Sequence, residues 1–567
     1  MTSRPVASYQ TERLLVYDDS EALPAVTSPQ FQSDWRTLAG KCPWSTSLQS
    51  PEFVCTWYEC YGEVYRPLVL VRHSAGGEMD GLLALAVERA TGKLTFAGAH
   101  QAEYNVWLAL PGEPTFLLEC LERLEQLGFA SLTFTYLPPG SPLEWLKGSW
   151  SDRSTLRAVQ RPLLTVDNID AVRESIGKKK NRRRLEKLQE NGPLTFLELH
   201  TPDELDTCYD DIIDFYDLRI GAVHGTCPFR DDPRKRGFYR ALMAKGILHV
   251  TITKVGETVV ASHIGLRNKQ EVVLGIVGHS PFQAIHSPGK LHILQLGLLM
   301  HEQGFSSLDL TPGGDSYKED RATRYDEAYE LTLFLDPKAR GHQDLSKSLA
   351  RTAARALHLD KEAASRLRSL ASNPVQSLHS SVHSLAKRTW SSSEARFYRM
   401  QADSVRDMPG DGIRRDCLRD LFCYQPGGTA DRSKQEFLKD ALSAIEAGVH
   451  FYSVVRDNDL MFYSQLVLAN DKGFARKLPY DYQYPSQSAA IAELYINPHY
   501  RDQGACLDSL RKVVSVAGRT MGAEFVYLTV DASDPSRKIA EQAGFLYQDS
   551  IIQSVKLGAV QTVLVKR

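Results

Sequence analysis

Three features that would assign a protein class at once are missing from this sequence. The 67 basic and 69 acidic residues leave a formal net charge of -2, so nucleic-acid binding would need a local patch. No apolar run approaches the length of a membrane-spanning helix, and residues 1–19 lack the apolar core of a signal peptide. The cysteines are odd in number and show no paired CxxC spacing, which argues against a disulfide framework and a zinc site; they stand at positions 42, 55, 60, 120, 208, 227, 417, 423 and 506. We therefore expect a cytoplasmic protein in a reducing compartment, without a metal.

The amino-acid composition is typical of a globular protein that is long enough for several hydrophobic cores. The sequence has 567 residues, of which 43% are hydrophobic and 24% charged, and this suits about three or four domains. Two apolar strands joined by a short turn occur at residues 66–87, again at 248–266 and again at 450–467. A further strand, a helix and another strand follow each time, which indicates one supersecondary plan used three times. The alternative is three unrelated hairpins, which are common in α/β proteins.

The stretch from Glu271 to Lys318 predicts a strand, a loop, a helix and a second strand. In the loop, Ser287 is a good N-cap, Pro288 suits the first helical position and Gly289 lets another molecule approach the backbone. The loop suits a phosphate, although an ordinary capped helix has the same sequence. Polar residues from Asp309 to Lys318 follow the second strand, at the sheet edge where ligands bind in open α/β sheets.

A second loop of this kind lies near the carboxyl end. The predicted strand 491–496 leads through Arg501 and Gly504 into an apolar helix, and a strand at 525–530 follows. Successive backbone N–H groups at such a helix start can cradle a pyrophosphate, and Gly504 permits close approach. A second helix is predicted to begin near Ser536 and to end at Gly544.

These motifs carry a resemblance to a known family. The order ETVVASHIGL, SPG, apolar helix and LDLTPGGDSYK, within residues 257–318, resembles the CelD/BcsL-type acetyltransferases, a branch of the GNAT superfamily close to the FemAB-like aminoacyl transferases. Arg501, Gly504 and Cys506 resemble the GNAT acetyl-CoA motif, R-x-x-G-x-G/A. The resemblance implies an α/β fold with mixed α+β sheets in tandem GNAT-like domains. We expect an N-terminal GNAT-like half at 1–164, a CelD/BcsL-type domain at 165–336, a helical basic connector at 337–395 and a C-terminal GNAT domain at 396–567.

The resemblance also implies an activity, the transfer of an acyl group other than an aminoacyl group. The donor would be acetyl-CoA or another acyl-CoA, and the acceptor an amine of a sugar, peptide or metabolite in envelope polysaccharide or secondary-metabolite synthesis. In the C-terminal domain Glu493 would be the base and Tyr547 the acid; in the central domain Asp315 and Lys318 would act, with Asp309 orienting them. The implied donor-binding residues are Ser287, Gly289, Lys290, Ile496, Arg501, Gln503, Gly504, Ala505, Cys506, Ser533 and Ser536.

The C-terminal domain departs from the family pattern in three places. Cys506 replaces a small Gly or Ala, Ser533 stands where Asn is usual, and Ala540 stands where many members have a tyrosine that protonates the thiolate. These departures bear on activity more than on fold.

Two other functions stay open. Six of the seven residues 178–184 are basic, which fits either a solvated helix face or a phosphate-binding patch. In a FemAB-like ligase that patch would bind aminoacyl-tRNA; otherwise nucleic acid is not expected. A non-catalytic scaffold would instead bind a partner or a membrane surface through the basic amphipathic connector. His224, His263 and His279 could each serve as a base, but a hydrogen-bonded structural role is commoner for such residues.

Overall fold

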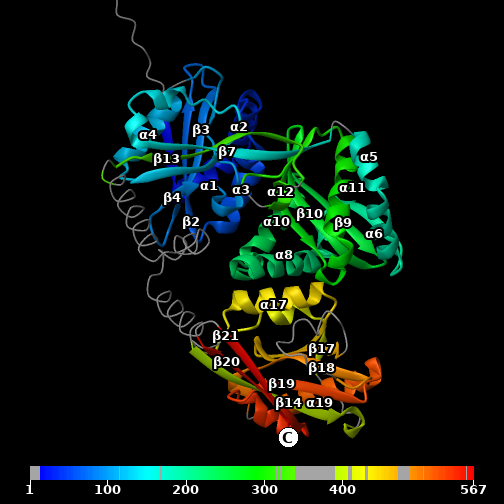
Figure 1. Ribbon diagram of the computed structural model, residues 1–567. Coiled ribbons are helices and arrows are strands. Elements are labelled where there is room, and N and C mark those ends of the chain that lie inside the picture. Colours follow the sequence, from blue (N-terminus) through cyan, green and yellow to red (C-terminus); the bar gives the residue numbers. More distant parts are fainter. Residues whose placement is uncertain are drawn as a thin grey trace, which may run out of the picture. The chain divides into compact units, whose positions relative to one another are not determined.

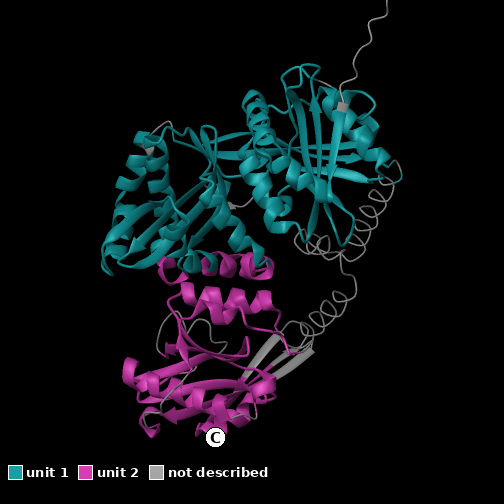
Figure 2. Ribbon diagram, turned by 180° about the vertical axis from the view of Figure 1, so that it is seen from behind, with its two compact units in different colours: residues 1–213, 232–280, 286–356 teal, residues 214–231, 281–285, 357–567 magenta. Residues whose placement is uncertain are grey.

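The computed structural model describes residues 13–113, 115–166, 169–313, 316–319, 321–336, 338, 390–405, 412–427, 432–469, 484–501, 504–556 and 559–566. Helices and mixed sheets alternate along these residues (Figure 1), which confirms the predicted α/β class. The chain forms two compact units (Figure 2): unit 1 comprises residues 1–213, 232–280 and 286–356, and unit 2 comprises 214–231, 281–285 and 357–567.

The first sheet is an antiparallel meander in unit 1. Its strands are β1 Arg13–Asp18, β2 Tyr65–His73, β3 Met79–Glu88, β4 Leu94–Phe96 and β5 Leu108–Ala109. The predicted hairpin is confirmed, since β2 pairs with β3 from Tyr65–Glu88 to His73–Met79. The accompanying helices are α1 Ala22–Thr27, α2 Pro29–Lys41, α3 Pro51–Tyr61 and α4 Phe116–Gln126. Ser50 caps α3 by accepting a hydrogen bond from the Phe53 N–H.

The second sheet, also in unit 1, has eight strands in the order β6-β13-β7-β12-β11-β10-β9-β8. Their bounds are β6 Ser131–Leu137, β7 Ser154–Thr165, β8 Leu194–Leu199, β9 Leu248–Val255, β10 Thr258–Asn268, β11 Glu271–His279, β12 Ser307–Asp309 and β13 Arg324–Phe334. The helices along this part of the chain are α5 Ile169–Gly177, α6 Lys179–Gln189, α7 Pro202–Asp206, α8 Tyr209–His224, α9 Pro228–Asp231, α10 Arg234–Ala244, α11 Pro288–Glu302 and α12 Ser316–Glu319. β11 and β12 are parallel, with α11 as the crossover.

The third sheet lies in unit 2 and has eight strands in the order β15-β16-β17-β18-β19-β14-β20-β21. Their bounds are β14 Trp390–Gln401, β15 Arg414–Arg415, β16 His450–Arg456, β17 Asp459–Leu468, β18 Ser488–Ile496, β19 Phe525–Asp531, β20 Leu546–Lys556 and β21 Ala559–Lys566. Its helices are α16 Leu418–Leu421, α17 Lys434–Glu446, α19 Gly504–Met521 and α20 Ser536–Ala543. The parallel pair is β18 and β19, with α19 as the crossover.

The two eight-stranded sheets follow one plan. In each, a meander leads to a parallel pair around a long helix, and a strand from earlier in the chain, β7 or β14, lies beside the second strand of that pair. The first sheet shares the hairpin and then departs, because β6, the strand after α4, pairs with β13 of the second sheet. The predicted boundary after residue 164 therefore falls at the end of β7, a strand of the second sheet.

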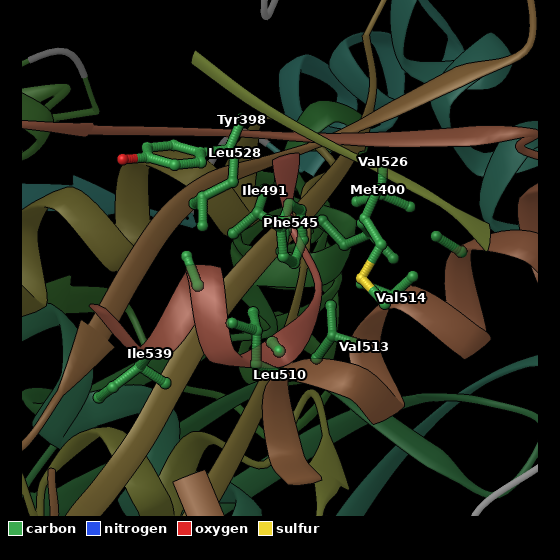
Figure 3. Packing of buried hydrophobic residues seen from close by; sticks show 14 of the residues in the cluster. Tyr398, Met400, Ile491, Leu510, Val513, Val514, Val526, Leu528, Ile539 and Phe545 are labelled. Carbon is green, nitrogen blue, oxygen red and sulfur yellow. The ribbon is translucent and has the colours of Figure 1, made fainter. Parts of the chain in front are cut away.

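The core of the third sheet lies on the face covered by α19 and α20. Leu510, Val513 and Val514 of α19 and Ile539 of α20 are buried against strand residues that include Met400, Ile491 and Val526, as Figure 3 shows. This apolar stripe on α19 is the one expected of a helix packed on a sheet.

The predicted connector, 337–395, lies almost entirely outside the described residues. Its last residues do not fit the prediction, because β14 already begins at Trp390. Within the described part of the chain, none of the helices combines the length and the apolar character that crossing a membrane requires.

Candidate functional site

The first candidate site is the start of α11 in the second sheet. All of β12 pairs with β11, from Glu271 to Val273, while β11 continues to His279, so β11 runs on past the end of its parallel partner before α11 begins. Ser287 precedes the helix as predicted, but it does not act as a side-chain cap. Its backbone has φ 52° and ψ 53°, the left-handed region, and a hydroxyl in that geometry is not directed at the next turn.

Gly289 and Lys290 differ in their surroundings. A Cβ on Gly289 would stand 3.3 Å from Nδ1 of His279, so the absence of a side chain there is explained by packing against this imidazole. Lys290 is exposed. The backbone at Gly289 is therefore less accessible to a phosphate than the sequence predicts.

Asp309, at the end of β12, is held in a buried polar network. Its Oδ2 accepts from the Tyr104 hydroxyl at 2.7 Å and from Nε of Arg161 at 3.1 Å, and its Oδ1 accepts from the Thr311 N–H at 2.8 Å. Arg161 also pairs with Glu271 and with Asp326. Burial raises the pKa of Asp309, while the Arg161 charge and the Tyr104 hydrogen bond act to lower it. With its oxygens engaged in this way, Asp309 holds β7, β12 and the Tyr104 segment together.

Lys318 is buried at 7% exposure and faces its own loop. Its Nζ donates to the Thr311 carbonyl at 3.3 Å, to the Thr311 hydroxyl at 3.1 Å and to the Pro312 carbonyl at 3.3 Å. These contacts fix the turn after β12. Asp315, its predicted partner, lies outside the described residues.

A group of buried histidines lies between the second sheet and α11. His292 of α11 bonds through its ring nitrogens to the hydroxyls of Thr251 and Thr253 at 3.0 and 2.8 Å. His263 of β10 is fully buried, and neither of its ring nitrogens has a hydrogen-bond partner. Burial lowers the pKa of His292 to about 3 and that of His263 well below its usual value. His263 is thus enclosed in the core, which does not suit a base that must reach a substrate.

The second candidate site is the start of α19 in the third sheet. β18 and β19 pair only from Ser488–Phe525 to Ile491–Leu528, although β18 runs on to Ile496. Residues 497–501 follow β18 and include the 3-10 helix Pro498–Tyr500, and α19 begins at Gly504; Gln503 lies outside the described residues. Gly504 is exposed, and a Cβ on it would meet nothing within 4 Å. Ile496 is buried in the core and Ala505 packs against it.

Arg501 and Cys506 flank Gly504 in different ways. The Nε atom of Arg501 is buried and has no hydrogen-bond partner, which is a costly arrangement unless a ligand completes it. Cys506 is fully buried, its Sγ lies 3.3 Å from the Tyr500 carbonyl, and burial raises its pKa to about 11. Its side chain therefore lies in the core, bonded to the segment just before α19, and the departure from Gly or Ala exposes no sulfur to a ligand.

The two predicted serines near α20 have structural partners. Ser533 donates from its hydroxyl to Asp531 at 2.6 Å and from its N–H at 2.8 Å. Ser536 is buried, and its N–H donates to Asp534 at 2.8 Å. The helix ends at Gly544 in the left-handed region, as predicted.

Glu493 of β18 has both carboxylate oxygens engaged. Arg432, just before α17, pairs with Oε1, and Gln465 of β17 donates to Oε2 at 3.1 Å. Gln465 also donates to the Tyr463 hydroxyl at 2.7 Å. Burial raises the pKa of Glu493, and the Arg432 charge opposes this rise. Glu493 thus lies on the strand before α19 as a largely buried carboxylate whose two oxygens both have partners.

Tyr547 of β20 lies on the other face of the same sheet. Its ring is 5.9 Å from that of Tyr398 and packs against the core under α19 and α20. Glu493, through Gln465 and Tyr463, faces α17, where Tyr463 contacts Phe437. The structure thus does not bring Glu493 and Tyr547 together as a base and acid pair.

Arg432, Arg161 and Tyr104 are residues of these networks that were not predicted from the sequence. Arg161 stands in an otherwise apolar strand end, QRPLLTV, and this isolated charge is the one local signal of a buried ion pair. Arg432 and Tyr104 meet their partners only through long-range packing, so no spacing in the sequence indicates them.

The basic run at the start of α6 is displayed to solvent. Lys178, Lys179, Lys180, Arg182 and Arg183 are exposed, and Arg184 is half-buried and donates to Asn181 at 3.3 Å. Leu185 and Leu188 of α6 pack in one cluster with Leu291 in the first turn of α11. The run therefore belongs to the same side of the second sheet as the start of α11.

One part of the chain matches a known family. Residues 177–319, from the end of α5 to α12, match the model of a family described as an acetyltransferase (GNAT) domain, so the central part of the chain is similar to a GNAT acetyltransferase domain. No curated protein matches the chain.

Three solved structures resemble more than half of the chain. FemX is 10% identical over 55% of this chain and 97% of its own, with a TM-score of 0.39. A tandem GNAT protein from the clavulanic acid biosynthesis pathway is 12% identical over 57% of this chain and 99% of its own, with a TM-score of 0.35. L-PGS from Bacillus licheniformis is 12% identical over 55% of this chain and 92% of its own, also with a TM-score of 0.35. Likenesses at these identities and scores say nothing about activity.

Proposed function

We propose that the protein is an N-acyltransferase of the CelD/BcsL type, which moves an acetyl or other acyl group from acyl-CoA to an amine of a sugar, peptide or metabolite in the cytoplasm. The observation that carries the proposal is the start of α19. An exposed glycine with open space at its Cβ position begins the helix that follows β18, a strand that runs on past its pairing with β19, and Arg501, three residues before this glycine, has a buried Nε without a hydrogen-bond partner.

The residues of this site fit a diphosphate-bearing thioester. The first N–H groups of α19 are free of intrahelical partners by the geometry of any helix, and the helix dipole favours an anion there. Arg501 would bind a phosphate oxygen through Nε. Acyl-CoA supplies the activated carbonyl, Glu493 takes a proton from the amine, and a backbone N–H of β18 beyond Ile491 would donate to the carbonyl oxygen.

Calorimetric titration of the full chain with acetyl-CoA tests this proposal. We expect saturable heat in the parent and a loss of at least about tenfold in affinity for Gly504→Glu, because a carboxylate would repel the phosphates. Lys290→Glu at the start of α11 is the control, since it also places a carboxylate at a helix start, with a larger change of charge than Gly504→Glu. Gly289→Glu is less informative, because its Cβ would lie 3.3 Å from Nδ1 of His279 and the imidazole would have to shift. Heat that is unchanged in Gly504→Glu and lost in Lys290→Glu would move the donor site to the second sheet.

A second candidate function is a FemAB-like ligase that uses aminoacyl-tRNA. The exposed basic run of α6 favours it, since five cations stand in solvent next to α11. In that case tRNA affinity should fall steeply with salt, and replacing Lys179, Lys180 and Arg183 by Gln should reduce the slope of log K against log salt by about 0.7–0.9 for each phosphate that these side chains no longer neutralise. Lys187→Gln is the control, because Lys187 already pairs with Glu190.

A further inference from the structure

The guanidinium of Arg432 occupies the space between two carboxylates on the α17 face of the third sheet. It pairs with Glu493, and its Nη1 donates to Oδ2 of Asp440 at 3.1 Å. Its Cζ lies 5.7 Å from the centre of the Phe437 ring, within the range of a cation–π contact. The Arg432 carbonyl accepts from the Tyr424 hydroxyl at 2.9 Å. The side chain of Arg432 is thus held by two carboxylates and an aromatic ring, and its main chain by the Tyr424 hydroxyl.

This arrangement conflicts with the role proposed for Glu493. An amine acceptor arrives at neutral pH as an ammonium, and Glu493 must accept a proton from it. A carboxylate paired with a guanidinium holds a proton less readily, because the neighbouring charge favours the anion. Oε1 of Glu493 is also the oxygen that Arg432 covers. The ammonium of the acceptor and the guanidinium of Arg432 therefore compete for the same position beside Oε1 of Glu493.

We propose that Arg432 is an intramolecular competitor for the acceptor, which it keeps from Glu493 until a cationic amine displaces it. This inference rests on the proposed acyltransferase function and deepens it. The acceptor is a primary amine whose ammonium takes the place of the guanidinium between Glu493 and Asp440, with its carbon stem against Phe437. Arg432 can be displaced outward, since its side chain is 39% exposed and that of Asp440 54% exposed, while Glu493 is 18% exposed.

The transfer then balances without a further reactant. The ammonium gives one proton to Glu493 once the guanidinium has moved. The neutral nitrogen attacks the thioester carbonyl, the C–N bond forms and the C–S bond breaks. The second proton leaves the nitrogen as the adduct collapses and ends on the departing sulfur. The products are an amide, a thiol and a protonated Glu493, which returns its proton to water.

Removing the guanidinium tests the competition directly in the full chain. The probes are methylguanidinium and n-butylammonium, with n-butanol as the neutral analogue, measured by calorimetry. A tethered group acts at an effective concentration in the millimolar range, so Arg432→Ala should bind both cations at least about tenfold more tightly than the parent, as a site freed from an occupying state does. Glu493→Gln in the Arg432→Ala background should abolish this gain. Arg414→Ala is the matched control, because Arg414 pairs with a buried carboxylate, Asp420, elsewhere in unit 2. Cation binding no tighter than in the parent, or an equal gain for n-butanol, would overturn the competition.

Kinetics with acetyl-CoA and n-butylamine separate competition from positioning. We expect Arg432→Ala and Arg432→Gln to lower KM for the amine with kcat unchanged or raised, and Arg432→Lys to restore a KM close to that of the parent. A lower kcat with unchanged KM would show that Arg432 only positions Glu493 and would refute the competition. The affinity for acetyl-CoA should be the same in all of these variants. Absence of acetyl-CoA heat in the parent would refute the acyltransferase function itself, whereas acetyl-CoA binding without cation binding in Arg432→Ala would refute only the role of Arg432.

Discussion

The Tyr104 hydroxyl donates a 2.7 Å hydrogen bond to Asp309, although the two residues are 205 positions apart in the chain. Both side chains are buried, and Arg161 binds the same carboxylate oxygen at 3.1 Å. The segment before β5 is in this way tied to the end of β12. The segment between the first sheet and β6 is therefore joined to the second sheet of unit 1 by a buried polar contact.

Removing Asp309 should destabilise unit 1 strongly. Asp309→Ala leaves Arg161 buried with one carboxylate fewer, and breaking a buried pair in this way costs about 3 kcal/mol. Tyr104→Phe removes one hydrogen bond to the same carboxylate and should cost about 1–2 kcal/mol. Urea unfolding, with hydrogen exchange of residues 307–309 to assign the transition, measures both. Glu330→Ala, which breaks the exposed pair with Arg157, is the control and should stay within about 1 kcal/mol. An Asp309→Ala variant as stable as this control would refute the structural role.

The buried histidines should make unit 1 sensitive to acid. The pKa of His292 is lowered to about 3 in the folded state, against about 6.5 in the unfolded chain. The unfolded state therefore binds more protons between these values, so stability is complete above pH 6.5 and falls as the pH drops toward 3. The free energy of unfolding should fall by on the order of 3 kcal/mol between pH 6.5 and pH 4, since each pH unit corresponds to about 1.4 kcal/mol for one proton.

His263 allows this pH dependence to be checked by substitution. His263→Leu removes two buried nitrogens without partners, so the free energy of unfolding at pH 7 should be unchanged or about 1 kcal/mol higher, and its loss toward pH 4 should be smaller than in the parent. Free energies of unfolding measured at pH 7 and pH 4.5 for the parent and for His263→Leu test this prediction. An unaltered slope in His263→Leu would contradict the assignment of acid sensitivity to this group.

Ser50 and Ser287 precede helices in the same Ser-Pro context but should respond differently to substitution. Ser50→Ala removes the hydrogen bond to the Phe53 N–H and should cost about 1 kcal/mol. Ser287 makes no such bond and has a left-handed backbone, so Ser287→Ala should cost little and Ser287→Gly should stabilise by about 1 kcal/mol. Thermal unfolding of the three variants tests this, and equal losses in Ser50→Ala and Ser287→Ala would show that Ser287 caps α11 after all.

Cys506 should be unreactive and dispensable for donor binding. Its thiol is buried and its pKa is raised to about 11, so iodoacetamide at pH 8 should not modify it until the chain unfolds. Cys506→Ala should lower stability by about 1 kcal/mol because it leaves a small void in the core, and it should leave the heat of acetyl-CoA binding unchanged. Peptide mass spectrometry of the alkylated protein and calorimetry provide the two readouts. Modification of Cys506 in the folded chain, or loss of acetyl-CoA binding in Cys506→Ala, would place the sulfur in the site.

Elements whose signal is local were predictable. Ser50 before Pro51, the apolar spacing of α19 and Gly544 after α20 each act within one or two turns, and the structure confirms them. The loops before α11 and α19 were also found, because a strand, a glycine and an apolar helix in succession are a local pattern. The sequence did not predict toward which face of a sheet each side chain points. Glu493 and Tyr547 share a sheet but face opposite layers, and this depends on register and on β-bulges such as the one between Gln465 and Leu466.

The sequence by itself determined the α/β class, the helix starts and the order of strand, loop, helix and strand that two of the sheets share, because these follow from periodicity and backbone preferences of neighbouring residues. Only the tertiary structure decided that Asp309 and Lys318 bind their own scaffold, that Cys506 points into the core and that Arg432 covers Glu493. Each of these outcomes depends on which distant strands and helices come together, and a buried charge or hydrogen-bonding group takes whatever partner that packing supplies.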